Sequence, residues 1–194
     1  FERGDYLAKM GLKSQDTAEL FFNDVKIPRE NLLGEVDRGF YHLMHGLAEE
    51  RLLAAIGFIA NAEAAFAVTA DYIGERKLFG KALAEFQNTR FKMAEMRTEL
   101  DVSQVLVDRC VMIHNEGELS SDDAAKAKLF TSEVEGRVTD ECVQLHGGNG
   151  YMDEYAVSRY YTNARVSRIY AGTSEIMKEI IARSLGLDPR KKKG

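Results

Sequence analysis

Residues 52–70 read Leu-Leu-Ala-Ala-Ile-Gly-Phe-Ile-Ala-Asn-Ala-Glu-Ala-Ala-Phe-Ala-Val-Thr-Ala, and this stretch decides the fold. It continues a segment that begins near Phe40, in which apolar side chains recur every three or four residues. The spacing predicts one long helix over residues 38–75. Because residues 52–70 are apolar on nearly every face, the helix must be covered from several sides, which predicts self-association.

The chain has prolines only at Pro28 and Pro189, so the 160 residues between them can form long uninterrupted helices. Helical spacing predicts further helices over residues 88–116, 120–146 and 153–166, and a last one from Thr173 or Ser174 to Gly186. Upstream, residues 17–27 are rich in aromatic and β-branched side chains and predict a strand. The expected fold is mainly α, an up-and-down four-helix bundle preceded by the last strand or strands of a β-region.

The composition argues against a nucleic-acid-binding protein and against a membrane-spanning one. A net charge of −5, with both signs spread along 194 residues, excludes a broad basic face for nucleic acid. The longest run without a polar side chain is nine residues, 52–60, so no membrane span is predicted. The basic tail at 190–193 is interpreted as a solvated terminus. The chain starts at Phe1 without a targeting pattern, which indicates a piece of a longer protein.

Residues with catalytic or ligand chemistry are few. Cys110 and Cys142 form no Cys-x-x-Cys pair, which favours free thiols in a reducing compartment. The histidines lack the supporting ligands of a metal site, and no Glu-x-x-His pairs occur, so none is predicted. The glycines of residues 147–150 follow no strand, so they are either a helix-ending turn or a close approach to a ligand.

Glu50 is the one candidate acid–base residue. Helical geometry aligns it with Leu43, Leu47 and Ala54 on a largely apolar stripe, where a carboxylate is expected to be partly desolvated. Desolvation raises a carboxylic pKa toward the range that a general base needs near neutral pH. The alternatives are a solvated glutamate or one neutralised by Arg51.

Four segments together resemble the acyl-CoA dehydrogenase family. They are Lys-Met-Gly-Leu-Lys-Ser-Gln-Asp-Thr-Ala-Glu-Leu-Phe-Phe-Asn-Asp-Val (9–25), Glu-Arg-Lys-Leu-Phe-Gly-Lys (75–81), Val-Gln-Leu-His-Gly-Gly-Asn-Gly-Tyr (143–151) and Ile-Tyr-Ala-Gly-Thr-Ser-Glu-Ile (169–176). The resemblance implies that residues 1–35 close a middle β-domain and that 36–188 form the C-terminal helical bundle domain, which makes dimer or tetramer contacts. Residues 189–194 are then a basic tail.

The resemblance also implies an activity. The family oxidises acyl-CoA to trans-2-enoyl-CoA in fatty-acid β-oxidation, a base removing the α-proton while the β-hydrogen leaves as hydride to N5 of FAD. Electron-transfer flavoprotein is the implied electron acceptor. Most members carry the base in a Tyr-Glu-Gly-Thr motif, where this chain has Ala171. The long-chain and isovaleryl-CoA branches instead carry the base in a Glu-Arg pair on the first long helix. The corresponding pair in this chain is Glu50-Arg51, so the resemblance implies that Glu50 is the base.

The same resemblance assigns two sets of binding residues. The residues expected to contact FAD are Arg76, Phe79, Gln87, Gln144, Leu145, His146, Gly147, Gly148, Thr173, Ser174 and Glu175. The first eight of these are expected to contact the FAD of a neighbouring subunit. The residues expected to border the acyl-CoA are Tyr41, Ala48, Glu49, Arg51 and Gly172. No metal is implied.

Two alternatives to a long-chain enzyme remain open. The sequence around residues 39–41 and 177–183 resembles the long-chain branch. The segment Ala171-Gly-Thr-Ser-Glu, however, also fits the isovaleryl branch, which acts on a branched-chain acyl-CoA. A non-catalytic oligomerisation module is favoured by Ala171 and opposed by Glu50-Arg51. The chain by itself is expected to be inactive, and its compartment is the bacterial cytoplasm or the mitochondrial matrix.

Overall fold

The computed structural model describes residues 1–188, and the predicted basic tail lies outside the described residues. The helices are α1 (Gly39–Glu75), α2 (Gln87–Asn115), α3 (Ser121–His146), α4 (Ala156–Ala164) and α5 (Ser174–Ser184). The short strands are β1 (Glu2–Arg3), β2 (Leu20–Phe21), β3 (Lys77–Leu78) and β4 (Lys81–Ala82). The 3₁₀ turns are η1 (Arg29–Asn31), η2 (Leu83–Glu85), η3 (Gly147–Tyr151) and η4 (Arg165–Arg168).

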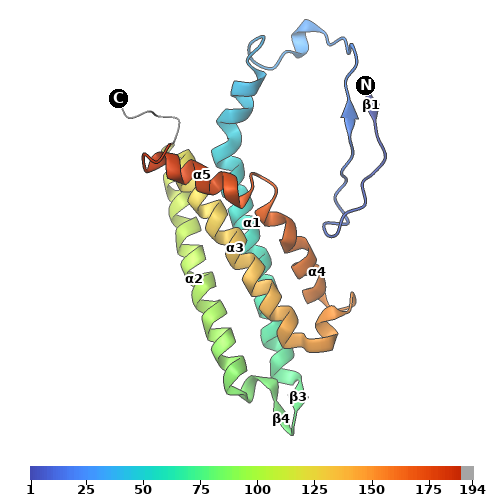
Figure 1. Cartoon of the computed structure of the whole chain (residues 1–194), viewed down its shortest axis with the longest axis vertical. Helices are drawn as coiled ribbons and strands as arrows, with labels where there is room; N and C mark the ends of the chain where they lie inside the picture. Colours follow the sequence, from blue (N-terminus) through green and yellow to red (C-terminus); the bar gives the residue numbers. More distant parts are fainter. Residues whose placement is uncertain (189–194) are drawn as a thin grey trace.

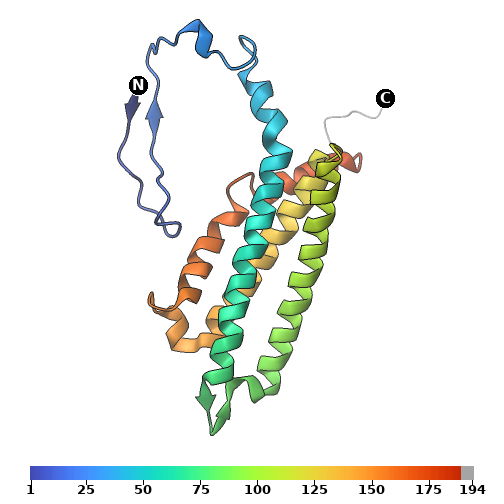
Figure 2. The same cartoon turned by 180° about the vertical axis from the view of Figure 1, so that it is seen from behind.

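The long helices α1, α2 and α3 lie side by side, α4 covers α1 and α3, and α5 crosses the end of the bundle (Figures 1 and 2). The mainly α, four-helix expectation is therefore confirmed. Small side chains of α1, among them Ala62 and Ala65, are completely buried, which allows α3 to approach closely. The core at this level is completed by Met96, Leu100, Val134, Val138, Cys142 and Val157.

Most helix boundaries agree with the sequence. The predicted starts of α3 and α5 are confirmed by their caps, because the Ser120 hydroxyl accepts the Asp123 N–H at 3.0 Å and the Thr173 hydroxyl accepts the Ile176 N–H at 3.3 Å. Both cysteines are free and buried. These boundaries could be predicted because a helix cap and the spacing of apolar side chains each depend on only a few neighbouring residues.

Two local predictions need correction. The strand expected over residues 17–27 is much shorter than predicted, because only Leu20–Phe21 is a strand, paired antiparallel with Glu2–Arg3. No second layer among the described residues covers its apolar side chains, so Phe22 and Ile27 are exposed. The helix expected over 153–166 is only Ala156–Ala164, since turns occupy the residues before it and η4 follows it.

The sequence analysis also missed the hairpin formed by β3 and β4 between α1 and α2. Its two central residues, Phe79 and Gly80, have φ of +51° and +84°, the backbone conformation of a tight two-residue hairpin turn. The hairpin projects from the end of the bundle opposite α5 (Figure 1).

The first turns of α1 extend beyond the bundle (Figure 2). Leu43 is 69% exposed there, and Glu50 is exposed as well. The expected partial desolvation of Glu50 is therefore wrong within this chain: Leu47 and Ala54 of the same stripe are half-buried, but no described segment covers the Glu50 side chain. Although α1 is long and apolar enough to meet length and composition criteria for a membrane span, its covered face packs against α3.

Candidate functional site

A cavity of about 410 Å³ opens where α1 ends, the hairpin leaves the bundle and α3 turns into η3. Six residues predicted to contact FAD line it: Arg76, Gln144, Leu145, His146, Gly147 and Gly148. The structure therefore brings together two predicted segments that are almost 70 residues apart in the chain. Its remaining lining residues are Tyr72, Leu78, Leu83, Asn88, Thr89, Lys92 and Asn149.

Tyr72 and His146 form the inner wall of this cavity. Their rings stack with centroids 4.1 Å apart, and the Tyr72 hydroxyl donates to the His146 carbonyl at 3.2 Å. Asn149 Nδ2 in turn donates to the Tyr72 hydroxyl at 3.0 Å. Burial lowers the pKa of His146, so the ring is neutral at pH 7, and Nδ1 donates to the Cys142 carbonyl at 2.8 Å. The wall is thus a fixed, uncharged surface.

The glycines of residues 147–150 have two separate uses. Gly147 has a φ of +59°, and a Cβ added to Gly147 or Gly148 would meet nothing within 4 Å, so their backbone is open to a ligand. A Cβ on Gly150 would lie 2.5 Å from the Val143 carbonyl oxygen, so that glycine is required by packing. The helix-ending alternative is confirmed, because Gly147 ends α3 with a positive φ, whereas contact of this turn with a ligand stays a prediction.

The cavity offers cations and amides to a ligand. Arg76 and Lys92 supply positive charge, although Lys92 also pairs with Glu141, and Gln144 and Asn88 supply amides. A planar guanidinium donor beside open glycine backbone fits an anionic diphosphate. Phe79 and Gln87 do not line the cavity: Phe79 is 95% exposed at the hairpin tip, and Gln87 is exposed at the start of α2.

The other three residues predicted to contact FAD, Thr173, Ser174 and Glu175, line a second hollow of about 240 Å³ at the start of α5. Ser174 Oγ donates to Glu133 Oε1 at 2.9 Å, which ties α5 to the middle of α3. Hydrogen bonds from its own backbone N–H and from Thr173 lower the pKa of Glu175. His146 follows Glu133 by thirteen positions along α3, so the two hollows lie roughly 20 Å apart.

Arg51 connects α1 to this second region. Its side chain is 8% exposed and Nε has no hydrogen-bond partner, so burial lowers its pKa, while Glu50 acts in the opposite direction. Its charge also acts on the buried Lys128, whose Nζ donates to the Gly172 carbonyl at 2.6 Å. The structure therefore places Arg51 and Gly172, two predicted acyl-CoA residues, around the same lysine.

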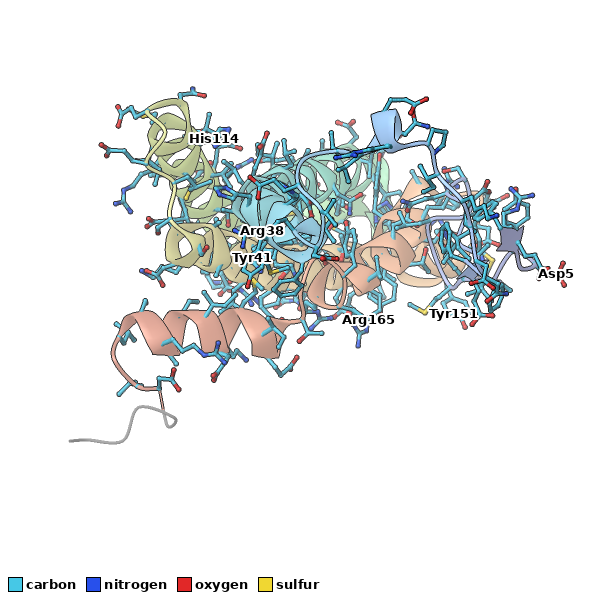
Figure 3. All side chains as sticks on the ribbon, turned by 90° about the horizontal axis from the view of Figure 1, so that it is seen from above. Asp5, Arg38, Tyr41, His114, Tyr151 and Arg165 are labelled. Carbon is cyan, nitrogen blue, oxygen red and sulfur yellow. The ribbon has the colours of Figure 1, made fainter. Side chains whose placement is uncertain are left out.

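The remaining predicted acyl-CoA residues lie toward the free end of α1. Ala48 is half-buried, Glu49 is exposed, and Tyr41 is exposed beneath Arg38, whose guanidinium carbon lies 4.3 Å from the ring centroid (Figure 3). The Glu50 carboxylate points back along α1, since a Cβ on Gly46 would lie 3.6 Å from Glu50 Oε1.

Sequence reasoning missed Lys128 and Glu135, both buried on α3. Glu135 accepts a hydrogen bond from Asn61 Nδ2 at 2.8 Å, its Oε2 has no partner, and burial raises the pKa of the carboxyl to about 7. The available signal was helical spacing, because both residues share a face with the buried Ala124 and Thr131. Among residues 1–188, no three His, Cys, Asp or Glu side chains lie close enough to hold a metal ion.

Known proteins resemble this chain over nearly its whole length. Residues 37–186 match the family model described as "Acyl-CoA dehydrogenase, C-terminal domain". The mouse "Long-chain specific acyl-CoA dehydrogenase, mitochondrial" is 49% identical over 188 residues, which are 97% of this chain and 44% of that protein. The rice "Isovaleryl-CoA dehydrogenase, mitochondrial" is 38% identical over 185 residues, 95% of this chain and 45% of that protein.

Solved structures show the same arrangement. An acyl-CoA dehydrogenase from Geobacillus kaustophilus is 48% identical with a TM-score of 0.92, covering 95% of this chain and 48% of that one. A chain from a study of the electron transferring flavoprotein of Acidaminococcus fermentans is 39% identical with the same TM-score of 0.92, covering 96% and 49%. This chain thus spans less than half the length of these relatives. It belongs to the acyl-CoA dehydrogenase family and corresponds to the C-terminal helical domain.

Proposed function

We propose that the full-length protein carrying this chain is a flavin-dependent acyl-CoA dehydrogenase that converts acyl-CoA to trans-2-enoyl-CoA, with Glu50 as the base. One observation carries the proposal. Arg51, the neighbour of Glu50, acts electrostatically on Lys128, and Lys128 donates to the Gly172 carbonyl in the turn that holds Ala171, which supports a site shared by the Glu-Arg pair and this turn. Ala171 cannot accept a proton, and the resemblance to the long-chain and isovaleryl branches assigns that role to the Glu50 carboxylate instead. Residues 1–35 then belong to a middle β-domain.

In this proposal Glu50, Arg51 and Gly172 have different roles in the reaction. Glu50 takes the α-proton of the thioester, and the electron pair of that C–H bond forms the double bond. FAD, which the residues around Arg76 and Gly147 would hold, would supply the hydride acceptor for the β-hydrogen. Arg51 is buried beside Glu50 in the sequence, and the Glu50 charge partly offsets the burial that lowers the pKa of Arg51. Gly172 offers backbone rather than a side chain to the acyl-CoA.

The two separated hollows support two flavin contacts by each subunit. The cavity around Arg76 and Gly147 fits the diphosphate portion, and the free N–H groups at the start of α5 also suit an anion. Their separation of roughly 20 Å on α3 favours contact with two different flavins in a symmetric assembly. The projecting hairpin, with Phe79 exposed at its tip, supports the proposed contact of Phe79 with the flavin of a neighbouring subunit.

Arg76→Ala is expected to weaken FAD binding by about ten- to a hundredfold, because a charge-assisted contact to phosphate is lost. The measurement is the FAD dissociation constant of the full-length protein, from the change in flavin fluorescence on binding. Lys77→Ala removes an exposed cation on the next residue that does not line the cavity, and it should leave the constant unchanged. Equal effects of the two substitutions would contradict the proposed role of Arg76.

Self-association is supported by two uncovered apolar surfaces. On α1, Leu53 is 60% exposed in the stretch that the sequence predicted to need covering. Between α2 and α3 lies an open groove of about 870 Å³ with Phe91, Val102 and Phe130 in its lining. These apolar surfaces are the kind that subunit contacts bury.

Val102→Asp is expected to reduce the oligomer of the full-length protein to a smaller particle, since it puts an unpaired charge into the groove. Sedimentation velocity measures the change. Gln104→Glu adds a charge to the same helix at an exposed position outside the groove lining, and it should not alter the particle mass. A Val102→Asp protein with the wild-type mass would exclude the groove from the subunit contact.

The substrate and the electron acceptor are also part of the proposal. We propose a long-chain acyl-CoA, with the isovaleryl thioester as the alternative, and electron-transfer flavoprotein as the acceptor. The test is anaerobic titration of the full-length flavoprotein with both thioesters, following bleaching of the flavin absorbance. Stronger bleaching by the long-chain compound supports the proposal, and bleaching by neither favours a non-catalytic oligomerisation module.

A further inference from the structure

Lys128 on α3 has no exposed surface and is the largest completely buried side chain among residues 1–188. Burying an ammonium group costs several kcal/mol unless its donors are satisfied. Nζ donates to the Ser167 carbonyl at 2.7 Å and to the Gly172 carbonyl at 2.6 Å, and it lies 5.9 Å from the centroid of the Phe58 ring. Two carbonyls and an aromatic face thus surround the three N–H donors.

The two carbonyls lie at either end of the turn that links η4 to α5. Within this turn Ala171 and Gly172 have φ of +53° and +95°, and the alanine is strained in that left-handed conformation. A Cβ on Gly172 would lie 2.6 Å from Met177 Cε, so the backbone there is also tightly packed. A strained turn keeps a single conformation only when surrounding contacts stabilise it. Lys128 donates hydrogen bonds to carbonyls at both ends of this turn.

The charges around Lys128 are not those of an ordinary ion pair. Glu133 and Glu175 attract the ammonium and Arg51 repels it, while burial lowers the pKa of Lys128. No carboxylate among the described residues lies within ion-pair distance of Nζ. The direct partners of the lysine are therefore backbone atoms of the turn, which indicates a role in fixing backbone.

We infer that Lys128 is a positioning residue that holds the turn at 167–172, so that Gly172 borders the acyl-CoA and the first N–H groups of α5 face the flavin. The inference rests on the proposed function, which gives Gly172 and residues 173–175 those ligands. It adds a residue that touches neither ligand and acts through the backbone.

The test compares two substitutions on α3 in the full-length flavoprotein. Lys128→Met keeps a long unbranched side chain and removes the charge and the donors. Lys126→Met removes an exposed lysine that pairs only with Asp122 on its own helix. Hydrogen exchange followed by mass spectrometry reports on residues 167–176, and flavin fluorescence and steady-state kinetics report the FAD dissociation constant, kcat and KM.

For Lys128→Met we expect at least tenfold faster exchange confined to residues 167–176, at least fivefold weaker FAD binding, and a raised KM for acyl-CoA. Lys126→Met should change none of these. Unchanged exchange in the turn, unchanged FAD affinity, or faster exchange spread evenly through α1, α2 and α3 would each overturn the inference.

If Lys128→Met does not fold, Lys128→Gln replaces it, since a neutral amide can still donate to one carbonyl. The same local loosening and weaker FAD binding are then expected. A Gln variant that is also unfolded, or that behaves as wild type, overturns the positioning role. Failure of the proposed function is separately visible: wild-type protein would not bleach with any acyl-CoA, while exchange in the turn would still show whether Lys128 holds it.

Discussion

Glu50→Gln in the full-length protein is expected to lower the rate of flavin bleaching by acyl-CoA at least about a hundredfold, with FAD still bound. Positioned general bases contribute about 10²- to 10⁴-fold, and an amide cannot take the α-proton. The substitution keeps the size of the side chain, and Glu50 is exposed within this chain, so the fold should tolerate it. Anaerobic stopped-flow absorbance of the flavin measures the rate.

Glu49→Gln is the matched control, because Glu49 is the preceding exposed carboxylate on the same helix. It should bleach at nearly the wild-type rate, since the proposal gives Glu49 only a place at the border of the acyl-CoA. If Glu50→Gln bleaches as fast as wild type, or if Glu49→Gln shows the larger loss, Glu50 is not the base.

The helices were predictable because their signals are local. Apolar spacing gave α1 and α2, and Ser120 and Thr173 marked the starts of α3 and α5 with side-chain caps that the structure contains. The strand over residues 17–27 is shorter than predicted because strand formation depends on partners far away in the chain. Only Glu2–Arg3 pairs with it among residues 1–188.

The candidate site was predictable to a lesser degree. Arg76 and the segment 144–148 were named from motifs, and the structure gathers them in one cavity. The burial of Glu50 was predicted wrongly, because helical spacing says which side chains share a face and not what covers that face. Lys128 was missed because a lysine is read as a surface residue, and its carbonyl partners lie about 40 residues further along the chain.

Glu135→Gln is expected to make the protein more stable than wild type above about pH 7. Near pH 4.5 the variant and the wild type should differ little in stability. Burial raises the pKa of Glu135 to about 7, whereas an unfolded glutamate has a pKa near 4.5. Between these values the unfolded chain has lost the proton and the folded chain keeps it, so stability falls as the pH rises. This difference between the two pKa values lowers the free energy of unfolding of the wild-type protein by roughly 3 kcal/mol once the pH is above 7.

The groups that face Glu135 explain why glutamine should relieve this cost. Asn61 donates to Oε1, and Ser167 and Arg168 also favour the ionised form, yet burial outweighs all three. Glutamine keeps an oxygen for Asn61 and cannot ionise. Thermal unfolding of both full-length proteins at pH 5 and pH 8 measures the effect, and the other carboxyl groups cancel in the difference. A difference that does not grow with pH would mean that Glu135 is ionised in the folded protein, with Arg168 compensating its burial.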